Sequence, residues 1–463
     1  MTAPRHAPDE PREPDDGNGS LTAADVNGRL VAAVLAGDAR AVADCLADGA
    51  DPHTPGPDGL PLLCAAVRGF DHASAGALTD GGADPDVVLP DGTTPLLRAV
   101  DLGSPALVGA TLGTDPRLRI AGSERQRLLD LARHWHETGA AAELRRRTGD
   151  LGPVTRRMVE EEYTDIEELT LGGLTVRAGH SGVLSDLERE FGVLPPVAEL
   201  VARAVPYPDP LDANWSAARH ALACRRNPRD WSELAALRRH PDPVHRRLLA
   251  DVLRFRRFLA AHVGRPDTAK DADFLARWAR DEPDGEVLAA VLEVYTDADH
   301  PGQEAIGLRH ADHPDPRVRR VVPYCLPPTG PAGTVLLGLA RDSDAGVRHV
   351  VAEVLGRSPD PAAVRESLLA LLRDPDPAVR VRAAASLAGS RDRTAAVMEA
   401  LVALLDEEDQ SLRLEAACAL AVRDDPRTDA AYERVGPLGP GFEEDHRVSA
   451  HWHYRFRNRP GGS

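Results

Sequence analysis

The sequence predicts a mostly α-helical protein of 463 residues built as an α-solenoid, a stack of similar helix pairs. One reason is a short phrase, with an Asp four residues before an Arg, that returns four times between Asp312 and Val422. Another is a different phrase that returns after 33 residues near the N-terminus. The composition agrees, because 42% of residues are hydrophobic but only 4% are aromatic, which suits close-packed helices. Repeats of this period are typical of stacked helical units.

The phrase in the C-terminal half predicts two antiparallel helices in each repeat. An Asp-Pro step such as Asp376-Pro377 supplies a capping oxygen and a preset φ, so a helix should begin there. Apolar residues then recur at helical spacing, and another apolar helix precedes each cap. Successive arginines lie 29, 32 and 33 positions apart in the pairs Asp315 and Arg319, Asp344 and Arg348, Asp376 and Arg380, and Asp409 and Arg413.

This phrase resembles HEAT repeats, in the short form that is also found in the repeat family named after phycobilisome lyases. The resemblance implies paired helices and a role as a scaffold, an adaptor or occasionally a catalytic body. The arginines are either a structural ladder or the edge of a groove that binds a partner, and the sequence leaves both readings open. They are Arg319, Arg348, Arg380 and Arg413.

Residues 1–24 form an acidic tail that we expect to be disordered. The sequence of residues 25–118 predicts a second repeat array. GDARAVADCLADGADP is echoed by GFDHASAGALTDGGADP, and DGTTPLLRAV resembles the Thr-Pro-Leu-His opening of ankyrin repeats, with Leu97 at the His position. The resemblance implies binding of another protein through the turn tips. The tip residues are His53, Asp58, Val88 and Asp91. The alternatives are that they only solvate the turns and that so short an array only caps the next domain.

Residues 119–205 match neither phrase and are expected to form a helical connector with a β-hairpin. The hairpin signal is the alternation of Leu and Val with Thr around Gly172-Gly173. The acidic run before it is interpreted as a solvated helix face, with a cation or acid/base site as the alternative. Its members are Glu160, Glu161, Glu162, Asp165, Glu167 and Glu168. Any chemistry beyond binding is expected in this connector.

The HEAT-like array is expected to span residues 206–430, with a C-terminal tail at residues 431–463. A degenerate copy carries Asp242 and Arg246, and a further copy has Leu288 at the Arg position. The tail either folds back over the last repeat or stays mobile.

The composition excludes several classes of function. A formal net charge of -18 argues against nucleic-acid or anionic-membrane binding, because both need a basic face. The five cysteines form no Cys-x-x-Cys pair, which suits a reducing compartment. The N-terminus has no apolar core and the chain has no long apolar stretch, so neither a signal peptide nor a membrane span is expected. A cytoplasmic protein is predicted.

No motif of an enzyme, a cofactor site or a metal site was found in the sequence. The His134/His136 pair lies in a predicted helix, where residues two apart diverge, and the His451/His453 pair is better explained by docking of the tail. The sequence therefore predicts a scaffold or adaptor that binds another protein, without cofactor, metal or catalytic residues. The alternatives are an enzyme or lyase-type accessory with its site in the connector, and a nucleic-acid-binding array, which the net charge disfavours.

Overall fold

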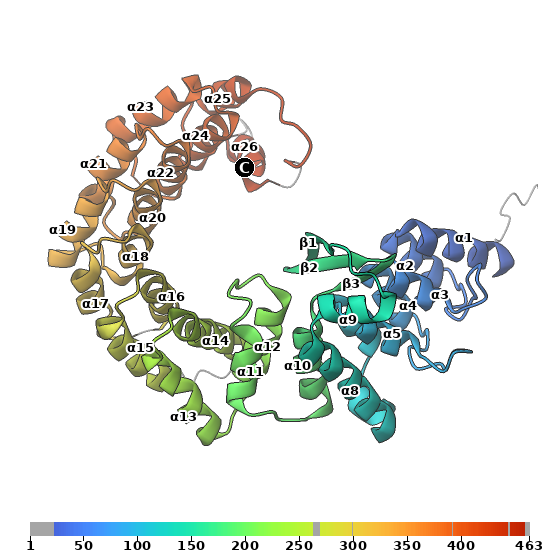
Figure 1. Cartoon of the computed structure of the whole chain (residues 1–463). Coiled ribbons are helices and arrows are strands. Elements are labelled where there is room, and N and C mark those ends of the chain that lie inside the picture. Colours follow the sequence, from blue (N-terminus) through green and yellow to red (C-terminus); the bar gives the residue numbers. More distant parts are fainter. Residues whose placement is uncertain (1–22, 263–268, 299, 391, 443–444, 459–463) are drawn as a thin grey trace, which may run out of the picture. The chain divides into compact units, whose positions relative to one another are not determined.

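The computed structural model describes the chain except residues 1–22, 263–268, 299, 391, 443–444 and 459–463. Helices dominate the described residues, which confirms the mostly α, solenoid class (Figure 1). The chain divides into two compact units, Met1–Glu233 and Leu234–Ser463. None of the described helices is long and apolar enough to cross a membrane. The expected acidic tail lies almost wholly outside the described residues.

Three short helix pairs open the N-terminal unit. The second helix of each pair begins at a side-chain cap, since Asp38, Asp71 and Ser104 each accept a hydrogen bond from a backbone N–H three residues on. The pairs are α1 (Ala23–Ala36) with α2 (Ala39–Ala47), α3 (Leu62–Arg68) with α4 (His72–Asp80), and α5 (Pro95–Leu102) with α6 (Pro105–Leu112). Their facing apolar residues form one core, which includes Leu30, Val42, Leu62, Leu78, Leu96 and Leu107.

After the third pair, helices precede and follow a three-stranded antiparallel sheet along the chain, so this part extends a little beyond the expected connector at residues 119–205. The strands are β1 (Thr155–Glu161), β2 (Thr164–Leu171) and β3 (Leu174–Arg177), in the order β1-β2-β3. The helices are α7 (Pro116–Arg119), α8 (Gly122–Thr138), α9 (Ala140–Thr148), α10 (His180–Phe191), α11 (Val197–Ala204), α12 (Ala213–Ala223) and α13 (Pro228–Ala236). The predicted hairpin is therefore confirmed as β2–β3, with Leu171 opposite Leu174.

The acidic run is not a helix face, and this interpretation was wrong. Its residues lie on β1, on β2 and in the turn between them, and two of them, Glu161 and Glu168, are buried. The physical reason is the two-residue period of a strand, which turns alternate residues to opposite faces. One face of the sheet packs its apolar residues Leu169, Leu171 and Val176 against Trp135 and Leu144. The other face carries threonines and charged residues.

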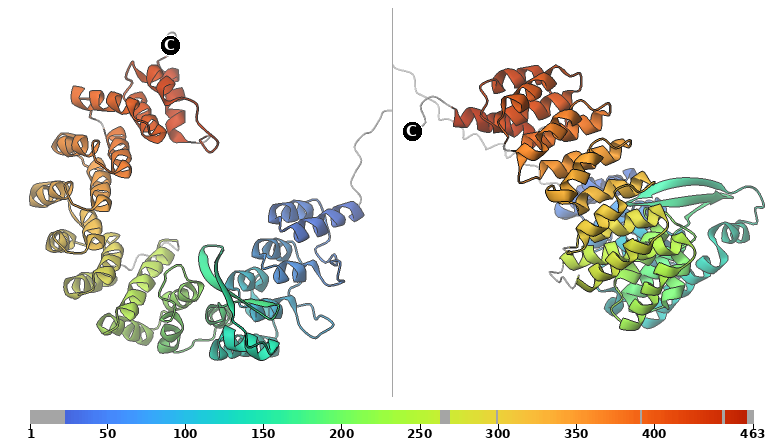
Figure 2. Two further views of the ribbon diagram at one scale, coloured as in Figure 1. Left: turned by 45° about the horizontal axis from the view of Figure 1, so that its top comes forward. Right: turned by 90° about the vertical axis from the view of Figure 1, so that its left-hand side faces the viewer.

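The C-terminal unit stacks its helices in two rows, and Figure 2 shows the stacking from two further sides. In Figure 1 the inner row comprises α14 (Pro243–His262), α16 (Gly285–Thr296), α18 (Pro316–Val321), α20 (Ala345–Gly356), α22 (Pro377–Gly389) and α24 (Gln410–Val422). The outer row comprises α15 (Ala269–Asp281), α17 (Gln303–His310), α19 (Gly330–Leu339), α21 (Pro361–Leu371) and α23 (Ala395–Ala403). The caps predicted at Asp315, Asp344, Asp376 and Asp409 all accept hydrogen bonds from the helices they precede.

The C-terminal segment folds back onto the last repeat. This was one of the two alternatives for the tail, the other being a mobile segment. After α25 (Thr428–Val435), α26 (His446–Arg457) packs against α24. His451 stacks on Tyr432 with ring centroids 4.1 Å apart, and Arg447 forms an ion pair with Glu415 of α24 at 3.1 Å. The end of the array is therefore covered by its own chain.

Candidate functional site

The repeated arginines lie near the start of the inner helices, and each bonds back to the loop that precedes its own helix. The Nη1 of Arg348 donates to the carbonyl oxygens of Asp342 and Ser343 at 2.8 and 3.2 Å. The same bonds to the carbonyls six and five residues earlier recur at Arg246, Arg319, Arg380 and Arg413. One guanidinium thus satisfies two loop carbonyls in each of five copies.

The other side of the guanidinium reaches the next repeat. Arg348 makes two bonds of 2.7 Å to Asp374, and Arg319 binds Asp342 in the same way. These hydrogen bonds lower the pKa of both carboxyls below the usual value. The same aspartates also accept the backbone N–H of the cap two residues later. Each pair therefore ties one arginine, two consecutive loops and a helix start together.

These Arg–Asp contacts between consecutive repeats, here called the ladder, do not continue to the C-terminal end of the array. Arg380 and Arg413 keep their bonds to the loop carbonyls, but their buried Nε atoms have no hydrogen-bond partner among the described residues. Asp406, at the start of the next loop, instead pairs with Arg434. Arg319 and Arg348 are thus engaged on both sides and Arg380 on one.

The inner row carries a second, exposed set of charges. Glu286 of α16 accepts hydrogen bonds from Arg247 of α14 and Arg317 of α18, at 2.7 and 2.8 Å. Glu286 and Arg317 remain 54% and 58% exposed. With Glu293 and Arg320 they border a cavity of about 330 Å³ whose floor includes Ala289, Ala290 and Val321. This surface crosses three consecutive inner helices.

The turn tips of the N-terminal array repeat one backbone bond 33 residues apart. Asp58 accepts the N–H of Leu60, and Asp91 accepts the N–H of Thr93. Each carboxylate also pairs at 2.9 Å with an arginine of the following helix, but these arginines, Arg68 and Arg98, do not hold the same position in the repeat. Both carboxylates are therefore held by their own turns. All four predicted tip residues, His53, Asp58, Val88 and Asp91, are exposed, and Val88 is 73% exposed.

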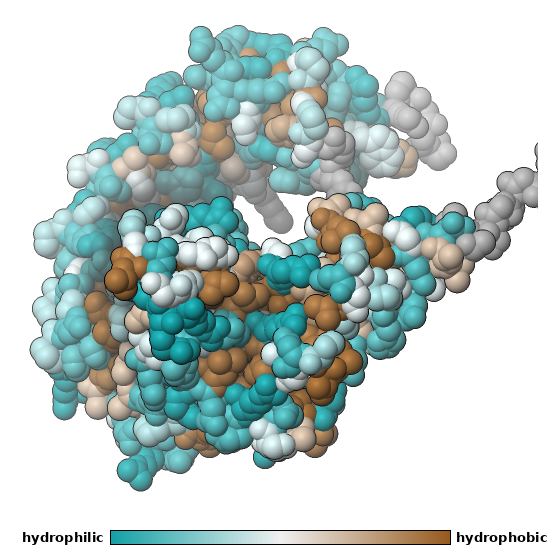
Figure 3. Space-filling view, turned by 45° about the vertical axis from the view of Figure 1, so that its right-hand side comes forward, coloured by the Kyte–Doolittle hydropathy of each residue, from teal (hydrophilic) through white to brown (hydrophobic). Residues whose placement is uncertain are grey.

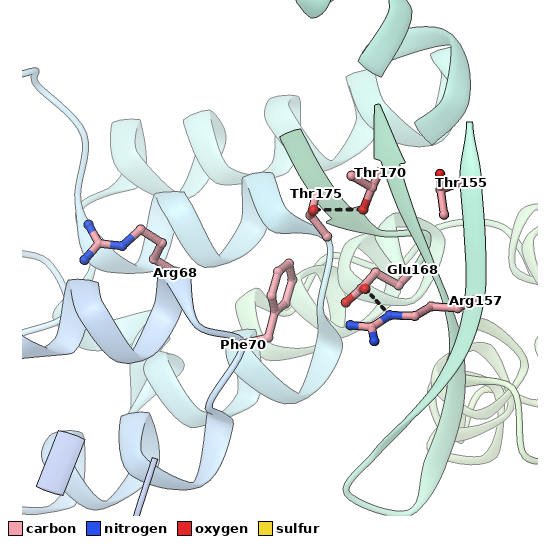
Figure 4. Close-up of a pocket in the computed structure, with 7 residues that line it drawn as sticks. All are labelled: Arg68, Phe70, Thr155, Arg157, Glu168, Thr170 and Thr175. Atoms are coloured by element: carbon pink, nitrogen blue, oxygen red, sulfur yellow. Dashed lines mark hydrogen bonds and ion pairs between the residues drawn. The ribbon is translucent and has the colours of Figure 1, made fainter. Parts of the chain in front are cut away.

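A pocket of about 420 Å³ opens between the polar face of the sheet and the turn that joins α3 to α4 (Figure 4). Two rows of side chains cross the three strands on this face. Thr155, Thr170 and Thr175 form one row, and Arg157, Glu168 and Arg177 form the next. Glu168 is the shared acceptor, because Arg157 donates to one oxygen and Arg177 lies 2.9 Å from the other.

Phe70 closes the pocket on the side of the helical array. Its φ of 56° is left-handed, a conformation that costs a non-glycine residue about 1 kcal/mol or more. The equivalent turns, 33 residues away on each side, have Gly37 and Gly103 with φ of 70° and 71°. The Phe70 ring lies 4.5 Å from the guanidinium carbon of Arg177. The turn between α3 and α4 therefore holds Phe70 at a position where the two equivalent turns of the array have glycine.

Charged groups are buried behind this pocket. Arg177 lies 3.5 Å from Glu161, and their side chains are 10% and 4% exposed. Burial raises the pKa of Glu161 and lowers the pKa of Arg177, because each charge has lost its water. Sequence reasoning missed this cluster because it read the acidic run as helical.

Three further residues lie close enough together to bind a metal ion, although they were not identified as metal ligands from the sequence. His240, Asp242 and His245 place potential metal-ligating atoms within 4.8 Å of one another. The two imidazoles stack with centroids 3.7 Å apart, and Nδ1 of His240 accepts the N–H of Asp242. Nδ1 of His313 makes the same bond to Asp315, so this histidine position helps to start a helix. The group thus fits helix capping better than metal coordination.

The two predicted His-x-His pairs do not form ligand sets in the structure. His134 lies 3.2 Å from Glu143, whereas Nδ1 of His136 lies 2.8 Å from the hydroxyl of Ser181. On α26, His451 bonds to Asp429 and His453 to the carbonyl of Ser449. The four imidazoles thus have separate partners.

Comparisons with known proteins support the repeat architecture of the C-terminal unit. Residues 365–432 match the HEAT-repeat family. Among solved structures, the X-ray structure of YibA from Escherichia coli is 17% identical, with a TM-score of 0.42 over 56% of this chain and 92% of that chain. That score is too low for the likeness to support an inference. No curated protein matches the chain.

Proposed function

We propose that the protein is an interaction scaffold whose partner protein lies along the inner row of helices in the C-terminal unit. The observation that carries the proposal is the charged row Arg247–Glu286–Arg317 at the rim of its cavity, in which Glu286 and Arg317 are exposed. Arg319 and Arg348 fix their repeats to the following ones through Asp342 and Asp374, so little conformational entropy is lost when a partner binds. The alternating charges would select the partner's orientation more than they add affinity.

The test is affinity capture with the full chain and two matched variants. Glu286→Arg with Glu293→Arg reverses two charges on the inner row, whereas Glu304→Arg with Glu366→Arg reverses two exposed charges on the outer helices α17 and α21. We expect a protein that the wild type and the outer variant enrich and the inner variant loses. Equal capture by both variants would overturn the proposal.

We also infer that residues 25–118 are an ankyrin-type array. The support is the sequence phrase together with the equivalent backbone N–H bonds that Asp58 and Asp91 accept in their turns. His53 and Val88 would then be the tip residues free to contact a partner. Affinity capture with a His53→Ala, Val88→Ser double variant tests this second surface, and we expect this variant to retain less of the partner protein than the wild type. If it retains as much, the partner binds only the C-terminal unit.

A second candidate function is binding of a small anionic ligand in the connector, the location of the alternative enzyme or accessory role. The observation that favours it is Phe70, held in a strained turn at a pocket with an exposed Arg157 and three threonine hydroxyls. Thermal shifts with phosphates and carboxylates would test it. Arg157→Gln should abolish a shift that Arg156→Gln, on the opposite face, retains. If no anion shifts the wild type, the candidate fails.

A further inference from the structure

The free edge of β1 is an exposed surface of the N-terminal unit. The order β1-β2-β3 leaves one side of β1 without a neighbouring strand among the described residues. Residues 155–158 are all exposed, Val159 is half-buried, and Glu160 is exposed again. An open strand edge presents backbone N–H and C=O groups that pair readily with another strand.

The side chains along this edge are symmetric in position and opposite in charge. Alternate residues of a strand share a face, so Arg156, Met158 and Glu160 point the same way. In an antiparallel pairing of two β1 strands centred on Met158, Met158 faces its copy. Arg156 then faces Glu160 of the second strand, and this pair occurs twice. Thr155 and Arg157 fall opposite Glu161 and Val159, so no like charges meet.

The state of these side chains in the single chain agrees with such a pairing. Glu160 forms no ion pair with any described residue, whereas Arg156 already holds Glu167 of its own chain at 2.6 Å. Met158 is 62% exposed, and Tyr163 in the adjoining turn is 84% exposed. Figure 3 shows hydrophobic residues reaching the surface at several places between hydrophilic ones. The edge thus offers one unpaired charge and two uncovered apolar side chains.

Charges on an edge strand often serve to prevent pairing, and this explanation has to be weighed. Residues that block an edge place the same sign at facing positions or point a charge inward. Here, self-pairing about Met158 brings opposite signs together at both facing positions. A second copy of the same strand is therefore attracted. Met158 is the midpoint of β1, so this register pairs all seven residues of each strand, whereas a register centred on Arg157 would bring two arginines together.

We propose that β1 pairs antiparallel with β1 of a second copy of this chain about a two-fold axis at Met158. The two three-stranded sheets then become one continuous sheet, and the backbone supplies most of the affinity. Because seven residues a side bury little area, the dimer should be weak, with a dissociation constant on the order of micromolar. The proposal is independent of any partner on the C-terminal unit.

Sedimentation of the full chain over a wide concentration range tests the dimer and its register. Glu160→Arg turns both facing pairs into like charges and should weaken the dimer roughly tenfold or more. Glu162→Arg makes the same charge change in the turn and should not weaken it. The swap Arg156→Glu with Glu160→Arg restores opposite charges and should recover association. Equal weakening by the two single variants, or a monomer at every concentration, would overturn the proposal.

Disulfide capture gives a second readout that depends on position rather than charge. Cys224 is the exposed cysteine and the other four are buried, so both test proteins carry Cys224→Ser. Met158→Cys puts two thiols opposite each other at the axis, and a mild oxidant should link them into a dimer. Glu162→Cys should link far more slowly. Equal linking rates would place the contact elsewhere and overturn the register.

Discussion

The arginines of the ladder differ in whether their removal leaves a buried aspartate without its cation. Arg348→Ala strips two bonds from a loop and leaves Asp374, whose side chain is 6% exposed, without its cation. Breaking such a pair costs about 3 kcal/mol. Arg380→Ala removes the same loop bonds but no partner across the repeat, so a loss of about 1 kcal/mol is expected. Urea unfolding of both variants checks the difference, and equal losses would contradict a cross-repeat role for Asp374.

His180 makes the N-terminal unit sensitive to mild acid. It stacks on Trp135 with centroids 4.3 Å apart, and burial lowers its pKa to about 4. The unfolded chain takes up the proton near pH 6.5, so the folded state binds fewer protons between these values. The contribution of His180 to the free energy of unfolding should therefore fall by about 3 kcal/mol as pH drops from about 6.5 to about 4. His180→Phe should flatten that slope, and an unchanged slope would assign it to other groups.

The helices and the β2–β3 hairpin were predictable because each carries a local signal. Asp376-Pro377 marks a helix start within two residues, and Gly172-Gly173 marks a turn between alternating apolar positions. The strand β1 has no such signal. It buries almost none of its residues, so its sequence TRRMVEE shows no apolar alternation. Without β1, the row of Arg157, Glu168 and Arg177 and the pocket beside it could not be foreseen.

The ladder could be seen in the sequence but its partners could not. Arg319 and Arg348 bind acids 23 and 26 residues later, separations that no local pattern encodes. A usable hint was the second Asp in Asp342-Ser-Asp344 and in Asp374-Pro-Asp376, two residues before each cap. That acid accepts the N–H of the cap and receives the arginine.

Docking of α26 depends on few side chains, which makes it testable. Tyr432 stacks on His451 and its hydroxyl donates to the carbonyl of Arg447. Tyr432→Ala removes both contacts and should cost about 2 kcal/mol. Amide exchange should then rise across residues 446–457. His453→Ala is the control, because His453 is exposed and bonds to Ser449 of its own helix. Equal effects would mean that the stack does not hold α26.

The two units have separate cores, so a substitution that destabilises one unit should leave the stability of the other unit largely unchanged. In a stacked array each helix pair contacts only its neighbours, so a lost cap weakens its own stack first. Asp38→Ala removes the cap of α2, and Asp409→Ala removes the cap of α24, each at a cost of about 1 kcal/mol.

Amide exchange on both variants should therefore rise within Met1–Glu233 for the first and within Leu234–Ser463 for the second. The expected rise is greatest beside the altered cap and declines from repeat to repeat, because each interface carries only part of the stability. Exchange that rises evenly over both units would mean that the chain unfolds as one cooperative body. A change confined to the altered unit would mean that the two units open independently, because a lost cap weakens only the stack that contains it.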